Sequence, residues 1–175
     1  MVQQAWNSST KCLPPAALLA MAGDLPRPLV FTNGVFDLLH VGHVSYLERA
    51  SRHGTCLVVA LNSDASARAL GKPGQRPVLP LAQRARLIAA LGCVGWVTWF
   101  DEARPQALLD GLRPEVYVKG GDYRVQDRPE ARQVSAWGGC TRIEAYLPGH
   151  STTALLQRIR HEGPLPSWGR QDEHA

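Results

Sequence analysis

The chain has 175 residues, of which 45% are hydrophobic and 19% charged, and its formal net charge at pH 7 is +4. This length suits one domain with a sizeable core, and the composition excludes a largely disordered protein. The chain has no block of five or six basic residues and no run of 18 apolar residues, so we expect neither a nucleic-acid partner nor a membrane span. A mild positive charge suits a polyanionic small-molecule ligand.

The cysteines are spread along the chain and show no zinc-binding spacing. They are Cys12, Cys56, Cys93 and Cys140. Because buried free thiols are ordinary, we expect a reduced, cytoplasmic protein without structural disulfides.

The chain divides into three parts by composition. Residues 1–26 are polar at first and then rich in proline, alanine and leucine, and we expect an N-terminal extension with one short helix after Pro15. Residues 27–160 form the predicted domain. Residues 161–175 carry glycine, proline and charge without a period, which predicts a disordered tail.

Apolar runs alternate with helical periods throughout the predicted domain. The runs predict strands at 29–32, 56–61, 96–100, 116–118 and 141–147, and the periods predict helices at 40–53, 81–91, 105–112, 130–137 and 151–160. Residues 68–80, with three prolines and two glycines, predict a loop. This alternation is typical of an α/β fold, and we expect a Rossmann-like three-layer sandwich with a mostly parallel five-stranded sheet.

Polar clusters stand at the ends of several predicted strands. They are Thr32–Asn33, Asn62–Asp64, Lys119–Asp122 and the loop before Ser151. In parallel α/β sheets ligands bind outside the carboxyl ends of the strands. The clusters therefore predict one common site, independently of any motif.

Two histidines mark the start of the first helix of the domain. His40 and His43 are spaced i, i+3, so both project from one face of the first turn. A helix N-terminus attracts phosphate through its free N–H groups and its dipole, and two imidazoles beside it form a phosphate clamp. Gly42 and Gly34 let phosphates approach the backbone closely. A zinc site is the alternative, but the other histidines form no companion pattern.

Further donors stand elsewhere in the sequence. Ser151–Thr153 cap the last helix and offer hydroxyl and N–H groups to phosphates, with His150 beside them as an open candidate. The candidate cations for pyrophosphate or an acceptor phosphate are Lys72, Arg76, Arg84 and Lys119. A Mg²⁺ ion carried by the triphosphate is expected, held more by phosphates than by a protein cage.

The pattern H-x-G-H on a strand, a turn and a helix is typical of nucleotidyltransferases. In that reaction an acceptor phosphate oxygen attacks the α-phosphorus of a nucleoside triphosphate, and pyrophosphate leaves. The nucleophile is already an anion, so the protein must mainly align the reactants and stabilise growing charge. The absence of a P-loop, of G-x-G-x-x-G after a strand and of G-x-S-x-G argues against kinases, dinucleotide dehydrogenases and hydrolases.

The motifs together resemble one family. VFTNGVFDLLHVGHVSYL at 30–47, LNSD at 61–64, RPVLP at 76–80 followed by Gln83–Arg84, VYVKGGDY at 116–123 and STT at 151–153 are similar to adenylyltransferase domains for D-glycero-β-D-manno-heptose 1-phosphate. The resemblance covers about residues 28–160. It implies that ATP and the heptose 1-phosphate give ADP-heptose and pyrophosphate, toward the lipopolysaccharide inner core.

The resemblance also implies roles for individual residues. It makes His40, His43 and Lys72 the catalytic candidates. The nucleotide would be bound by Thr32, Asn33, Gly34, Phe36, Gly42, Ser151, Thr152 and Thr153. The sugar phosphate or its phosphate groups would be bound by Asp37, Asn62, Asp64, Lys119 and Asp122. The candidate cations Arg76 and Arg84 are added to this substrate-binding set. No metal ligand is assigned to the protein.

The chain departs from the family at two points. Gly95 stands where many relatives carry aspartate, and the loop at 71–75 is spaced differently from the usual K-G-x-x-R-P-V around the lysine. Many organisms fuse this domain to a sugar kinase; nothing of the kind fits this chain, so we expect the pathway kinase to be a separate protein. The Trp96 and Trp99 edge would suit a homodimer, which is left open.

Two alternatives remain open from the sequence. One is a sister enzyme of the same superfamily, a cytidylyltransferase that acts on glycerol 3-phosphate or a similar small phosphate. The other is a nucleotide-binding module without turnover. Heptose stereochemistry and the choice between adenine and cytosine are not specified by any residue pattern.

Overall fold

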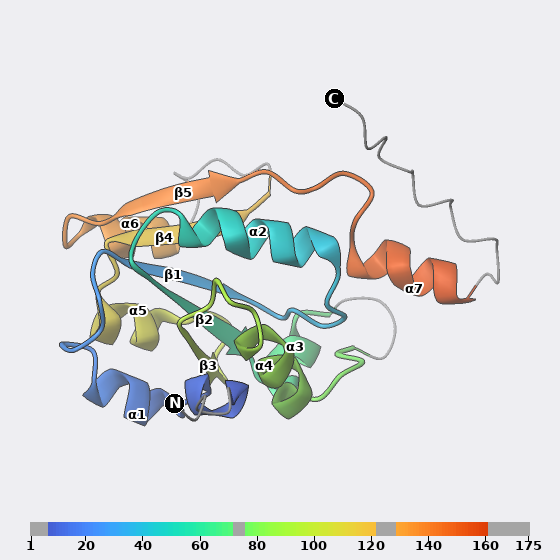
Figure 1. Ribbon diagram of the computed structural model, residues 1–175, viewed down its shortest axis with the longest axis horizontal. Helices are drawn as coiled ribbons and strands as arrows, with labels where there is room; N and C mark the ends of the chain where they lie inside the picture. The colour runs from blue at the N-terminus through green and yellow to red at the C-terminus, as the bar shows by residue number, and fades with distance from the viewer. Residues whose placement is uncertain (1–6, 72–75, 122–128, 161–175) are drawn as a thin grey trace, which may run out of the picture.

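The computed structural model describes residues 7–71, 76–121 and 129–160, and alternating strands and helices make up most of it (Figure 1). The elements before the middle of the chain are η1 (Ser8–Lys11), α1 (Pro15–Ala20), β1 (Leu29–Gly34), α2 (Val41–Ser51), β2 (Cys56–Asn62), α3 (Asp64–Ala69) and α4 (Leu81–Ala89). The elements after it are β3 (Trp96–Phe100), α5 (Gln106–Leu112), β4 (Val116–Gly120), α6 (Pro129–Ser135), β5 (Cys140–Glu144) and α7 (Thr152–Arg160).

The five strands form one sheet in the order β3-β2-β1-β4-β5, and every neighbouring pair is parallel. Every residue of β2 is buried, as a parallel strand covered on both faces requires. The prediction of an α/β sandwich with a five-stranded, largely parallel sheet is confirmed. Since all strands run the same way, their carboxyl ends meet at one edge, which positions the site.

Two hydrophobic clusters cover the two faces of the sheet. One contains Tyr46 and Leu47 of α2 and Ile88 of α4 against strand residues such as Val59. The other contains side chains from α1, α5 and α6 against the opposite face. The molecule is therefore a three-layer sandwich, and Figure 1 shows α7 beyond the end of the sheet toward which the strands point.

The N-terminal residues that the structure describes pack on this sandwich. Leu18 is fully buried in the cluster that contains α1, and Leu13 N–H donates to the carbonyl of Val97 in edge strand β3 at 2.9 Å. The Lys11 ammonium donates to the Val94 carbonyl at 2.8 Å. The core thus continues across the predicted boundary at residue 26. The predicted tail at 161–175 lies outside the described residues.

Three local details differ from the expected elements. Short helix α3 follows β2 directly, where only a polar strand end followed by a loop was predicted. Ser63 begins this helix, and its side chain accepts a hydrogen bond from the Ser66 N–H. Strand β1 continues to Gly34, and β5 ends at Glu144 rather than at residue 147.

All four cysteines lie in the described part of the chain and are free.

None of the helices in the described segments is both long and apolar enough to cross a membrane.

Candidate active site

The imidazoles of His40 and His43 lie together at the start of α2. His40 is the N-cap residue in extended conformation, and His43 lies in the first helical turn. Their rings stack with centroids 3.8 Å apart and planes 21° apart, and the ring of Phe36 lies 5.3 Å from that of His43. The prediction that the two histidines share one face is confirmed. Both rings therefore lie beside the free N–H groups of the helix, where an anion is favoured.

Gly42 lets the His40 ring and His150 lie close to the start of α2, because it has no side chain. A Cβ at residue 42 would lie 3.0 Å from the His40 ring and 3.1 Å from the Cβ of His150. His150, in the connection to α7, therefore lies next to the histidine pair. Burial lowers the pKa of His40 below its ordinary value, and the charge of His150 lowers it further. The lowered pKa favours the neutral form of His40, which can donate through one ring nitrogen.

Asn33 and Lys119 meet where β1 and β4 end. The Lys119 ammonium donates to the Asn33 carbonyl at 3.0 Å, and the Tyr117 hydroxyl donates to Asn33 Oδ1 at 2.9 Å. The side chain of Asn33 is therefore held at the carboxyl edge of the sheet. Sequence reasoning missed Tyr117, because a tyrosine in an apolar strand is indistinguishable from core.

Thr32 is fully buried and does not reach the edge of the sheet. Its hydroxyl lies 2.7 Å from the Tyr46 hydroxyl, which donates to the Val118 carbonyl at 3.1 Å. Burial raises the pKa of Tyr46 far above its ordinary value, so the phenol stays protonated. Tyr46 thereby ties α2, three residues after His43, to β1 and β4. Nucleotide contact by Thr32 stays a prediction, and the geometry favours a positioning role.

The turn after β1 has its left-handed residue at Phe36, with φ of 46°, and not at Gly34. A Cβ at Gly34 would lie 3.0 Å from the Phe36 ring. Gly34 therefore makes room for this buried ring, which packs on His43.

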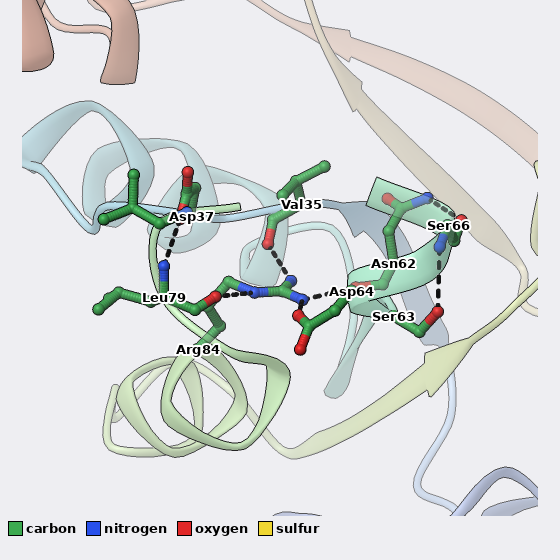
Figure 2. A network of polar contacts seen from close by, with 9 residues as sticks. Val35, Asp37, Asn62, Ser63, Asp64, Ser66, Leu79 and Arg84 are labelled. Carbon is green, nitrogen blue, oxygen red and sulfur yellow. Dashed lines mark hydrogen bonds and ion pairs between the residues drawn. The ribbon is translucent and has the colours of Figure 1, made fainter. Parts of the chain in front are cut away.

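Arg84 lies at the centre of a buried polar network (Figure 2). Its side chain is 0% exposed, and its guanidinium donates to the carbonyls of Leu79, Val35 and Asn62 at 3.0, 2.6 and 2.9 Å. It also forms an ion pair with Asp64 at 2.7 Å. Burial alone would raise the pKa of Asp64, but hydrogen bonds from Arg84 and the Leu81 N–H lower it below its ordinary value. Substrate contact by Arg84 stays a prediction, and this geometry favours a structural role.

Asp37 and Asn62 are buried beside this network. Asp37 Oδ1 accepts from the N–H groups of Val78 and Leu79 at 2.8 and 3.0 Å. The Asn62 side chain donates to the Ser66 hydroxyl at 2.9 Å. Both residues were predicted to bind the sugar phosphate, and that role is not tested by their present contacts.

Arg76, in the second half of the 68–80 loop, extends to the start of α7. Its guanidinium donates to the Thr153 hydroxyl at 3.2 Å. Ser151 accepts from the Ala154 N–H at 3.1 Å, which confirms the predicted cap. The structure thus brings Arg76 and the serine–threonine run together. Lys72 and Asp122 lie outside the described residues.

The described site is lined by imidazole, ammonium, guanidinium and hydroxyl donors at the carboxyl edge of a parallel sheet. Such a donor set suits phosphate oxygens. Fold and site together define a protein of the nucleotidyltransferase class.

Comparison with known proteins identifies the family. Residues 31–154 match the model described as cytidylyltransferase-like, and the chain belongs to this family. It is 53% identical over 153 residues to D-beta-D-heptose 1-phosphate adenylyltransferase from Bordetella bronchiseptica, covering 86% of this chain and 94% of that protein. It is also 53% identical over 144 residues to the bifunctional protein HldE from Streptomyces coelicolor, covering 82% of this chain and 31% of HldE.

Solved structures agree with this fold. The lipopolysaccharide core biosynthesis protein from Thermoplasma volcanium has a TM-score of 0.57 and 27% identity, over 68% of this chain and 95% of that one. Pantothenate synthetase from Thermus thermophilus has a TM-score of 0.51 and 15% identity, over 77% and 60% of the chains, and shows the fold alone.

Proposed function

We propose that the protein transfers AMP from ATP to D-glycero-β-D-manno-heptose 1-phosphate, giving ADP-heptose and pyrophosphate. The stacked pair His40 and His43 at the start of α2 carries the proposal of nucleotidyl transfer. The relation to the Bordetella bronchiseptica enzyme over nearly its whole length supports the choice of nucleotide and sugar.

In the proposed reaction, a phosphate oxygen of the sugar phosphate attacks the α-phosphorus of ATP. The bond from the α-phosphorus to the bridging oxygen breaks, and pyrophosphate leaves with that oxygen. His40 and His43 donate to oxygens on which charge grows, and preorganised donors of this kind lower the barrier without reorganisation. Asn33 and Lys119 line the adjoining strand end, and Ser151–Thr153 with Arg76 receive the outer phosphates.

Mg²⁺ fits this site as an ion that arrives with ATP. The donors that line the described site suit phosphate oxygens, so the triphosphate itself would hold the ion. When bound, the ion neutralises phosphate charge and favours departure of pyrophosphate.

The proposed reaction needs a sugar 1-phosphate, which a phosphoryl transfer to the anomeric hydroxyl must supply. That this kinase is a separate protein, that the enzyme is cytoplasmic and that it forms a homodimer stay predictions.

The experiment is pyrophosphate release from the purified protein with Mg²⁺, comparing ATP with CTP and the heptose 1-phosphate with glycerol 3-phosphate. Release only with ATP and the heptose phosphate is expected. Release only with CTP would favour the cytidylyltransferase alternative. No release from any pair, with ATP still bound, would favour a binding module.

A further inference from the structure

Val78 and Leu79 are held from two sides by buried charged residues. From the turn before α2, Asp37 accepts from both of their N–H groups, and from α4, Arg84 donates to the Leu79 carbonyl. Asp37 is 5% exposed and Arg84 is 0% exposed. Figure 2 shows Asp37 and Arg84 on opposite sides of Leu79. We name Asp37, Arg84 and the peptide groups of Val78 and Leu79 the clamp.

Arg84 is held in place by contacts outside the clamp as well. The same guanidinium binds the Val35 carbonyl beyond β1, the Asn62 carbonyl of β2 and the Asp64 carboxylate of α3. A planar guanidinium offers its donors in a fixed fork, and lysine cannot reproduce that geometry. Movement of Arg84 would therefore leave three buried or partly buried carbonyls without this donor, which is costly.

Arg76 stands two residues before the clamp and extends to α7. Its Nη2 atom donates to Thr153 Oγ1 at 3.2 Å. Among the residues that the structure describes, its Nε atom is buried and has no hydrogen-bond partner. A guanidinium next to hydroxyls and a helix N-terminus, with one donor unmet, suits an anionic oxygen.

We propose that Arg84 and Asp37 are positioning residues that hold Arg76 against the first turn of α7, where Arg76 binds the leaving pyrophosphate. Arg84 then acts on the reaction without contacting the ligand. This inference rests on the proposed nucleotidyl transfer.

The test is a double-mutant cycle between Arg84→Lys and Arg76→Ala, with kcat/KM for ATP and the dissociation constant of pyrophosphate as readouts. Each single variant is expected to lower kcat/KM and to raise the dissociation constant of pyrophosphate by about 10- to 100-fold, since each removes a hydrogen bond to a charged group. The double variant is expected to have the same kcat/KM and the same dissociation constant as Arg76→Ala alone, because Arg84 acts through Arg76. Independent, multiplying effects would overturn the proposal.

Arg49→Lys is the matched control. Like Arg84, Arg49 forms an ion pair, with Glu144 at 2.9 Å, but it is partly exposed, joins α2 to β5 and does not contact the clamp. Its effect is expected to multiply with that of Arg76→Ala. Coupling of the same size in this control would overturn the proposal, since it would reflect general destabilisation.

Asp37→Ala reaches the same segment from the other side and serves where Arg84→Lys does not fold. It is expected to show the same coupling to Arg76→Ala, and an additive result would overturn the proposal. A wild-type protein without turnover would refute the proposed function alone, because pyrophosphate binding still measures the coupling.

Discussion

His40 and His43 stack because the N-cap residue and the third residue of a helix lie on the same side of its first turn. Stacking fixes the direction in which each ring can donate. A bound phosphate therefore meets donors that need no rearrangement, which is the condition for a large electrostatic contribution to the rate.

The first prediction concerns these two side chains. His40→Ala and His43→Ala should each lower turnover by at least about a hundredfold, since one preorganised donor contributes about 10²–10³ in rate. Pyrophosphate release under saturating substrates measures the effect, and circular dichroism checks the fold. His53→Ala, at the other end of α2 in a contact with Glu144, should leave turnover unchanged. Full activity in both site variants would refute the mechanism.

The second prediction concerns the charge of His40. Burial lowers its pKa and the charge of His150 lowers it further, so the ring gains a proton at a lower pH than an unperturbed histidine does. Removing His150 removes the like charge, so His150→Ala should raise the pKa of His40, although burial still keeps it lowered. NMR titration of the imidazole signals measures this. An unchanged His40 titration would show that the two rings do not interact.

At the scale of elements, Tyr46 explains how α2 keeps its place. The ring packs in the core between α2 and the sheet, while the hydroxyl satisfies Thr32 and Val118 on two strands. A single side chain thus fixes the helix that carries the histidine pair relative to the strand ends. Its packing against strand residues shows that Tyr46 lies on the sheet-facing side of α2, one turn after His43.

The third prediction is that Tyr46→Phe destabilises the fold by about 1–3 kcal/mol, because buried polar groups lose their partner while the ring remains. Urea unfolding measures the change. Tyr146→Phe is the control: Tyr146 is 62% exposed, and its change should stay within about 0.5 kcal/mol. Equal stability of the two variants would contradict the role given to Tyr46.

The sequence predicts elements well where hydrophobic pattern decides them. The continuous apolar run of β2 and the H-x-G-H turn led to the correct strand, helix and layer order. Helix α3 was missed because six residues after a strand carry little periodicity, and only its serine cap signals it. The burial of Arg84 could not be predicted, because charge in a sequence does not reveal the four acceptors that enclose its guanidinium. Its contact with the substrate stays a prediction.

At the scale of the whole molecule, ion pairs hold both ends of the sheet. At the amino end, Glu115 before β4 binds Arg27 at 2.8 Å and the Leu29 N–H at 2.6 Å. At the carboxyl end, Glu144 of β5 binds Arg49 of α2 and His53, which follows that helix. Asp64, the first residue of α3, joins that helix to α4 through its ion pair with Arg84. Each carboxylate joins elements that are distant in the sequence.

These carboxylates make stability dependent on pH. Burial alone would raise the pKa of Glu144, but hydrogen bonds from His53 and Arg49 lower it below 4.5, its ordinary value. The pKa of Glu115 is lowered in the same way, against burial, by the Leu29 N–H and Arg27. A carboxylate whose folded pKa is lowered contributes stability above its unfolded pKa and loses it as pH falls through the folded value.

The fourth prediction follows from that sign. The free energy of unfolding in urea should fall as pH drops below about 4.5, because the unfolded chain then binds protons that folded Glu144, Glu115 and Asp64 resist. Glu144→Gln should be less stable than wild type at pH 6, since the charge that holds β5 to α2 is lost, but its stability should fall less in acid. The two curves should therefore converge toward pH 3. Curves that stay parallel would show that the Glu144 charge does not contribute, and that β5 is held to α2 by contacts that do not involve this carboxylate, such as the bond from Arg49 to the Ala145 carbonyl.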